Sequence, residues 1–261
     1  MRIIVASALF LILATGARAQ SVFIEDMTWP EVRDAIAAGK TTAIIYAGGL
    51  EQNGPHMALA KHNLIARHVA GQIAAKLGNA LVYPVVPYSP AGDGMARTGH
   101  MRFPGTVSLS PDVFMGVMRQ VAASALSSGF KQVYLLADHG QGVAEVRVAA
   151  ESLDAEWRPK GARVRYIDAQ TAPTQKMNAY MKEKGIAPGG HAGIAETSQV
   201  MSIDEKRQIR RDKYALSAAG PEPAAGVLVD PTPATADMGR IFLEMKVASA
   251  VEQIQAAAAQ K

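Results

Sequence analysis

Short runs of β-branched and aliphatic residues alternate with helical patterns along most of this chain of 261 residues. The runs typical of strands are 42–47 (TAIIYA), 80–87 (ALVYPVVP), 131–137 (KQVYLLA) and 163–169 (RVRYIDA). The patterns typical of helices cover about 63–77, 111–128, 143–156, 174–184, 194–201 and 235–257. Strands and helices that alternate in this way form a mostly parallel sheet with helices on both faces. Because no linker divides the chain, we expect a single three-layer α/β/α domain.

The first 19 residues have a different character from the rest. Arg2 is followed by a near-continuous apolar run from Ile3 to Ala14, and then by Ala17-Arg18-Ala19. A basic start, a short apolar core and an A-x-A site are typical of a secretory signal peptide. The alternative is a membrane anchor, but the run is shorter than the roughly 20 residues that span a bilayer. We therefore expect residues 1–19 to be removed, which leaves a domain of residues 20–261 in the periplasm or outside the cell.

Charge and cysteine content exclude several classes of protein. The formal charge of the whole chain is +4, and cleavage after Ala19 removes two arginines and leaves +2. Nucleic-acid binding requires a more basic, clustered surface, so it is not expected. The chain has no cysteine, which excludes a disulfide scaffold, an iron–sulfur protein and a thiol nucleophile. No other stretch is apolar enough to cross a membrane, so we expect no membrane association after cleavage.

Polar clusters occur at the ends of predicted strands or in adjoining loops. The first is 51–56 (EQNGPH) followed by His62, the second is 138–141 (DHGQ), and the third is 189–193 (GGHAG), which leads to Glu196. Ligands of open α/β sheets bind beyond the carboxyl ends of the strands. Imidazole and carboxylate groups at such positions suit Zn²⁺ or a similar divalent ion, although loop histidines also hydrogen-bond locally.

In this order, the clusters resemble the motifs of the creatininase family of metal-dependent amidohydrolases. The family motif E-x-H-G-x-H-L-P-x-x-x-D resembles 51–62 (EQNGPHMALAKH), and H-x-x-F-P-G-T resembles 100–106 (HMRFPGT). The motif N-G-H-(G/Y)-(G/E)-N resembles 137–142 (ADHGQG), and H-(A/G)-G-x-x-E-T-S resembles 191–198 (HAGIAETS). A late D-P-x-x-A-T-x-x-x-G pattern resembles 230–239 (DPTPATADMG). Five motifs in one order are specific, and they cover roughly residues 28–250.

The resemblance implies a set of metal ligands. In dinuclear members of the family, the first ion is held by the residues that correspond to Glu51, His62 and His139 of this chain. His62 stands where the family has an aspartate. A glutamate with two histidines is nevertheless a sound catalytic zinc set, with one position left for water.

The second ion of the family is expected to bind weakly or not at all. Asn53 and Gln141 stand where the family has a histidine and a glutamate, and neutral amides are poor substitutes for them. The imidazole of His62 also cannot bridge two ions as a carboxylate does. We therefore expect one ion, zinc or alternatively manganese. Asp138 and Glu196 are candidates to restore a second ion, and Asn53 and Gln141 are candidates to orient a substrate amide or a water.

The activity that the resemblance implies is hydrolysis of a carbon–nitrogen amide bond, cyclic or open, in a small molecule. His191 is the expected general acid or base that delivers a proton to the leaving nitrogen, and Glu196 is the second expected catalytic residue. One alternative is a non-catalytic member that binds a small polar ligand in the same pocket. Another is an interaction protein that uses 221–233 as a docking segment. The resemblance also implies a closed homo-oligomer, commonly a hexamer.

Overall fold

The computed structural model describes residues 21–218 and 226–259, so the predicted signal peptide and residues 219–225 lie outside the described residues. One parallel sheet has the strand order β2-β1-β3-β4. Its strands are β1 (Thr42–Ala47), β2 (Ala80–Val82), β3 (Gln132–Ala137) and β4 (Arg163–Tyr166). The α-helices are α1 (Trp29–Ala37), α2 (Lys61–Leu77), α3 (Pro111–Ser127), α4 (Val143–Trp157), α5 (Thr171–Glu183), α6 (Ile194–Gln208), α7 (Tyr214–Ala218) and α8 (Ala236–Ala259). Short 3-10 helices cover Ile24–Asp26, Gly99–Arg102, Arg158–Lys160 and Arg211–Lys213.

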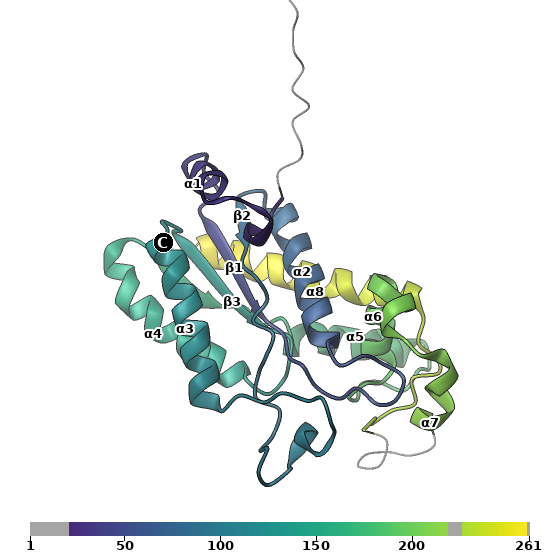
Figure 1. Cartoon of the computed structure of the whole chain (residues 1–261). Coiled ribbons are helices and arrows are strands. Elements are labelled where there is room, and N and C mark those ends of the chain that lie inside the picture. Colours follow the sequence, from purple (N-terminus) through teal and green to yellow (C-terminus); the bar gives the residue numbers. More distant parts are fainter. Residues whose placement is uncertain (1–20, 219–225, 260–261) are drawn as a thin grey trace, which may run out of the picture.

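Alternate residues of the central strand β1 face opposite sides of the sheet, and each side has its own core. Ile44 and Tyr46 pack in a cluster with buried residues of α2, α5, α6 and α8. Ala43, Ile45 and Ala47 pack in a second cluster with buried residues of α1, α3 and α4. Figure 1 shows these two sets of helices on the two faces of the sheet. The structure therefore confirms the predicted three-layer α/β/α domain.

The second predicted strand is shorter than expected. β2 ends at Val82, since Pro84 and Pro87 have no N–H group to donate to a neighbouring strand. The chain nevertheless continues alongside β1, because the N–H of Val86 donates to the carbonyl of Tyr46 at 3.1 Å. A strand was thus correctly predicted to begin at residue 80, but it ends at 82 and not at 87.

The fourth predicted strand also ends early, at Tyr166. Two residues later the carboxylate of Asp168 accepts hydrogen bonds from the N–H groups of Thr171, at 2.7 Å, and Ala172, at 3.1 Å. These contacts satisfy donors at the start of α5. The helix therefore begins at Thr171, three residues before the predicted start.

The helix α1 was not predicted, although its sequence carries a start signal. Thr28 and Glu31 form a capping box, in which the N–H of Thr28 donates to the Glu31 carboxylate at 2.6 Å. Pro30 stands in the first turn, where its missing N–H is not needed. α7 was not predicted either. None of the described helices combines the length and the apolar composition needed to cross a membrane.

The topology determines where the loops that follow the strands meet. β2 and β3 lie on opposite sides of β1, and the helices that lead to them, α2 and α3, cover opposite faces of the sheet. The connection after β1 and the connection that leads to β3 therefore run on opposite faces of the sheet. Open α/β sheets bind ligands at such a boundary, here between β1 and β3, beyond the carboxyl ends of the strands. The loops after β1 and β3 meet there.

Candidate metal centre and active site

Two glycines after β1 let the start of α2 lie directly against the loop that carries Glu51. A Cβ at Gly48 would overlap the Oδ1 of Asn63 and lie 2.9 Å from its Cα. The N–H of Gly49 donates to the same Oδ1 at 2.9 Å. A side chain at Gly48 would push the two segments apart, and a Cβ at Gly49 would lie 2.8 Å from Oγ of Ser89. The glycines thus hold the first turn of α2, with His62, beside Glu51.

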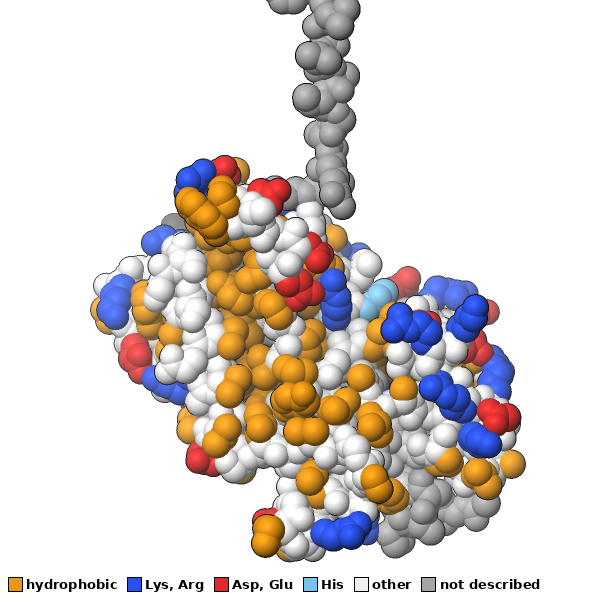
Figure 2. Space-filling model, in the orientation of Figure 1, with side chains coloured by type: hydrophobic (Ala, Val, Ile, Leu, Met, Phe, Trp, Pro, Cys, Tyr) orange, Lys and Arg blue, Asp and Glu red, His pale blue; other side chains and the backbone are white. Residues whose placement is uncertain are grey.

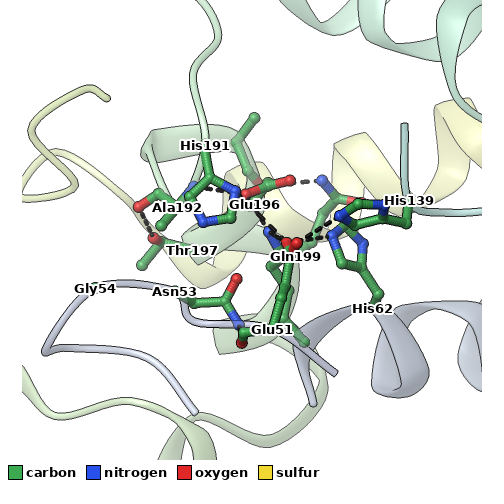
Figure 3. A network of polar contacts seen from close by, with 12 residues as sticks. Glu51, Asn53, Gly54, His62, His139, His191, Ala192, Glu196, Thr197 and Gln199 are labelled. Atoms are coloured by element: carbon green, nitrogen blue, oxygen red, sulfur yellow. Dashed lines mark hydrogen bonds and ion pairs between the residues drawn. The ribbon is translucent and has the colours of Figure 1, made fainter. Parts of the chain in front are cut away.

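Four imidazoles surround the carboxylate of Glu51, whose side chain is only 1% exposed. The nearest imidazole nitrogen lies 2.8 Å away in His62, 3.3 Å away in His100 and 3.5 Å away in His191, and Nε2 of His139 is also in contact. In Figure 3, His62 and His139 lie on one side of the carboxylate and His191 lies on the other. The structure thus brings together the three predicted metal ligands. It adds His100, which was not among the predicted site residues.

Hydrogen bonds on the far side of two imidazoles determine which nitrogen faces Glu51. The Nδ1–H of His62 donates to the Asp138 carboxylate at 2.7 Å, and the Nδ1–H of His139 donates to the Gln141 carbonyl at 3.0 Å. A neutral imidazole carries a single N–H, so both Nε2 atoms present lone pairs to the carboxylate. Acceptors that face one another need a cation between them, either a proton or a metal ion. Metal-binding histidines are oriented by the same kind of contact.

Glu51, His100 and His191 form a second group of closely spaced potential ligands, but its donor atoms differ. The side-chain oxygen of Gln52 accepts from the N–H of Gly54 at 2.9 Å, so the amide nitrogen of Gln52 donates to Nδ1 of His100 at 3.0 Å. Neutral His100 therefore presents an N–H, not a lone pair, to Glu51. Nε2 of His191 lies 2.9 Å from the carbonyl oxygen of Gln52 and 3.1 Å from its side-chain nitrogen, so it can donate to the first or accept from the second. Of the two groups, Glu51 with His62 and His139 offers the better metal site.

Two buried lysines that the sequence analysis did not select complete the charge pattern. Nζ of Lys61 lies 2.6 Å from the Glu196 carboxylate and 3.3 Å from that of Glu51. Nζ of Lys246, from α8, forms an ion pair with Asp138. Burial lowers the pKa of Lys61, but the charges of Glu196 and Glu51 outweigh this and raise the pKa above its usual value. Lys61 is therefore an ammonium at neutral pH.

The carboxylates of the site are ionised despite their burial. Burial raises the pKa of Glu51, Asp138 and Glu196, but neighbouring cations outweigh it and hold each pKa below its usual value. The dominant cation is Lys246 for Asp138 and Lys61 for the other two. Three carboxylates thus face two ammonium groups. Burial and the charge of Lys61 lower the pKa of His62, but Glu51 and Asp138 outweigh them and raise it above its usual value. The three carboxylates therefore favour a third positive charge here, either a proton on His62 or a bound metal ion.

His191 and Glu196, the two predicted catalytic residues, both line the pocket at the centre. Burial, reinforced by the charge of Lys61, lowers the pKa of His191 to about 3, so that its imidazole is neutral at pH 7. Glu196 lies in the first turn of α6, and it accepts the N–H of Ala192 at 2.6 Å. Neutral His191 can accept a proton on the ring nitrogen that carries none, whereas Glu196 is already paired with Lys61 and the N–H of Ala192.

The two predicted amide contacts lie farther from the centre. The side-chain nitrogen of Asn53 donates to the carbonyls of Glu51, at 3.0 Å, and Ala58, at 2.9 Å, so it braces the loop after β1. Gln141 lines the pocket with an exposed side chain, and its backbone carbonyl, rather than its amide, contacts His139.

The centre forms one wall of a pocket of about 300 Å³, a size that suits a small molecule. The opposite wall comes from α5 and α6. Two amide oxygens of this wall, in Asn178 and Gln199, are buried and have no hydrogen-bond partner among the described residues. Buried acceptors without partners are costly, so they favour a ligand that donates N–H or O–H groups.

A buried glutamate and two oriented imidazoles at the carboxyl edge of a parallel sheet form the type of centre found in metal-dependent hydrolases. The family model described as "Creatininase: Creatinine amidohydrolase" matches residues 25–254. The chain therefore belongs to the creatininase family, as its motifs indicated. Membership supports a metal-dependent amidohydrolase as the class of enzyme.

Related proteins are similar over most of their length. The creatinine amidohydrolase of Pseudomonas putida is 24% identical over 90% of this chain and 97% of its own. A mycofactocin precursor peptide peptidase of Mycobacterium tuberculosis is 27% identical over 81% of this chain and 83% of its own. Their names denote an amidohydrolase and a peptidase.

Solved creatininase structures share the fold. A structure described as creatininase Mn has a TM-score of 0.76 and 22% identity, over 91% of this chain and 99% of its own. A mutant creatininase of Zn-Zn type has a TM-score of 0.75 and 22% identity, over 92% and 99% of the two chains. These descriptions name zinc and manganese, which supports a divalent metal as the cofactor of the family.

Proposed function

We propose that this protein is an exported hydrolase that cleaves a carbon–nitrogen amide bond of a small molecule, with one zinc or manganese ion held by Glu51, His62 and His139. The observation that carries the proposal is the pair of Nε2 atoms that hydrogen bonds at Nδ1 direct at the buried carboxylate. A divalent ion fits this donor set and supplies positive charge to a site in which three carboxylates face two ammonium groups. When bound, such an ion activates a water and polarises the substrate carbonyl.

His191 is the proposed proton carrier. Its Nε2 contacts the carbonyl oxygen and the side-chain nitrogen of Gln52, and its Nδ1 lies 3.5 Å from Oε1 of Glu51. The neutral ring can accept a proton from the attacking water and return it to the leaving nitrogen, as general base and then general acid. Because the ring is neutral at pH 7, it acts first as the base.

The pocket supports a small polar substrate. Its volume of about 300 Å³ is at the lower end of the range for ligand pockets. The oxygens of Asn178 and Gln199 would accept N–H groups from an amide substrate, cyclic or open. The names of the relatives, an amidohydrolase and a peptidase, agree with attack on a carbon–nitrogen bond.

Assembly and location belong to the same proposal. The basic and apolar N-terminal segment supports export to the periplasm or beyond. Figure 2 shows apolar side chains gathered on the face between α3 and α2, which supports burial of this face in a homo-oligomer such as a hexamer. Exposed apolar side chains of the described residues include Trp29, Tyr88, Met95 and Val113.

The test is hydrolysis by protein that has been stripped with a chelator and reloaded with zinc or manganese. A panel of small linear and cyclic amides is incubated with each form, and released amine is measured. We expect amine to be released only by the reloaded protein. The reloaded His191→Gln variant should release none, because glutamine keeps an N–H donor but cannot take up and return a proton. A reloaded protein that binds metal and panel compounds without any release would instead favour a non-catalytic binding protein.

A further inference from the structure

Lys61 bridges two carboxylates inside the candidate centre. Its Nζ lies 3.3 Å from Oε1 of Glu51, a proposed metal ligand, and 2.6 Å from Oε2 of Glu196. The side chain of Lys61 is 0% exposed, and Lys61 does not belong to the lining of the pocket. Its ammonium therefore touches carboxylates of the protein and not the substrate.

A buried position between two carboxylates, one of which is shared with a neighbouring metal site, is a position for a cation. We propose that the ammonium of Lys61 takes the place of a second metal ion and restricts this centre to one ion. The inference rests on the proposed metal centre at Glu51, His62 and His139. Lys61 is in this sense a positioning residue, which holds Glu51 and Glu196 through fixed charge.

Local sequence places the ammonium where it is. Lys61 and His62 are consecutive residues in the first turn of α2, and both side chains are buried. His62 contacts Oε1 of Glu51 from the metal side at 2.8 Å, and Lys61 contacts the same oxygen. One turn of helix thus supplies both a ligand of the first ion and the substitute for a second.

Removal of the ammonium should create a vacancy for a second ion. Without Lys61, the buried carboxylate of Glu51 and the carboxylate of Glu196, which is 22% exposed, would face one another with no cation between them, which is unfavourable. A divalent ion can replace the lost charge and use the same oxygens as ligands. Lys61→Met removes the charge and keeps an unbranched side chain.

The test is the number of zinc ions bound per chain, measured by plasma mass spectrometry and by calorimetric titration of the stripped full chain. We expect one ion for the wild type, two for Lys61→Met, and one for Lys61→Arg, which keeps the positive charge. The double variant Lys61→Met/Glu196→Gln should return to one, because it removes the second carboxylate together with the ammonium.

Two ions in the wild type, or one ion in a folded Lys61→Met, would overturn the inference and leave the metal centre intact. No ion in the wild type would overturn the proposed function itself. If Lys61→Met does not fold, wild-type crystals grown with excess zinc give the answer by anomalous scattering. We expect one peak, beside Glu51, His62 and His139; a second peak bonded to Glu51 and Glu196 would overturn the inference.

Discussion

Asp138 accepts a hydrogen bond from Nδ1–H of His62 at 2.7 Å, and this contact directs Nε2 of His62 at Glu51. Asp138 comes from the end of β3 and His62 from the start of α2, so the contact joins two segments 76 residues apart. The same carboxylate pairs with Lys246 from α8. The orientation of one proposed metal ligand therefore depends on three separate parts of the chain.

We predict that Asp138→Asn weakens zinc binding roughly 10- to 100-fold, because the orientation and basicity of His62 depend on the charged acceptor. The variant should also be less stable, since Lys246 loses its buried counter-charge. Zinc affinity is measured by competition with a chelator of known affinity. Asp237→Asn, a change at an exposed side chain, is the control. An unchanged affinity in Asp138→Asn would show that this contact does not orient a ligand.

His139→Ala should abolish stoichiometric metal binding and leave the fold largely intact, because His139 lies in a loop after β3 and outside the two apolar cores. The control is Ile45→Ala in the central strand, where truncation of a fully buried side chain should cost about 2–5 kcal/mol of unfolding free energy. This control should retain one metal ion per folded chain. Circular dichroism and metal analysis separate the two effects. A folded His139→Ala protein that keeps its metal ion would contradict the assignment of His139 as a ligand.

Gly48→Ala should displace the start of α2 and reduce metal affinity, because the added Cβ would lie 2.9 Å from the backbone of Asn63. Gly116→Ala, in α3, provides a matched control. Its Cβ would meet nothing within 4 Å, so the greater helix propensity of alanine should stabilise the protein by about 1 kcal/mol. The thermal unfolding temperature should therefore fall in Gly48→Ala and rise in Gly116→Ala, and zinc affinity should fall only in Gly48→Ala. A Gly48→Ala protein with normal affinity would refute this account of the loop.

Acid should destabilise the protein through Glu196. Its pKa falls from 4.5 to about 2, because the charge of Lys61 outweighs the effect of burial. A carboxyl group with a lowered pKa contributes stability above its unfolded pKa and loses it as pH falls toward the folded pKa. We expect a loss on the order of 3 kcal/mol between about pH 5 and pH 2. Between these pH values, the free energy of unfolding of Glu196→Gln should fall less than that of the wild type. An equally steep fall in both proteins would show that Glu196 is not a source of the acid sensitivity.

Local patterns were sufficient to predict the central strands. β1 spans the predicted residues 42–47, and β3 differs from its prediction by one residue. Both are short apolar runs, followed by Gly48 in the first case and by the charged Asp138 in the second. The ends of β2 and β4 were less predictable. They depend on which neighbouring carbonyl or carboxylate takes each N–H, and such contacts come from distant residues.

The proposed metal ligands could be selected from the sequence because their motifs resemble those of a known family. The buried Lys61 and Lys246 are not ligand positions of those motifs, so the resemblance did not indicate them. Lys246 did carry a signal. It stands on the same face of α8 as Phe242, Leu243 and Ala250, at helical spacing, and a lysine on an apolar face indicates a buried partner. His100 carried a weaker signal, as the first residue of the motif 100–106 (HMRFPGT). It lies in a single turn of 3-10 helix, Gly99–Arg102, within a glycine-rich segment that is too short for periodicity to indicate which way a side chain points.

The central claim is a single metal ion at Glu51, His62 and His139, and metal content tests it most directly. The measurement is plasma mass spectrometry of the mature protein after supplementation with zinc and manganese and removal of unbound metal, beside Glu51→Gln prepared in the same way. The account predicts about one ion per chain in the wild type and almost none in the variant. Absence of metal from the wild type, two ions per chain in the wild type, or the same content in both proteins would contradict it.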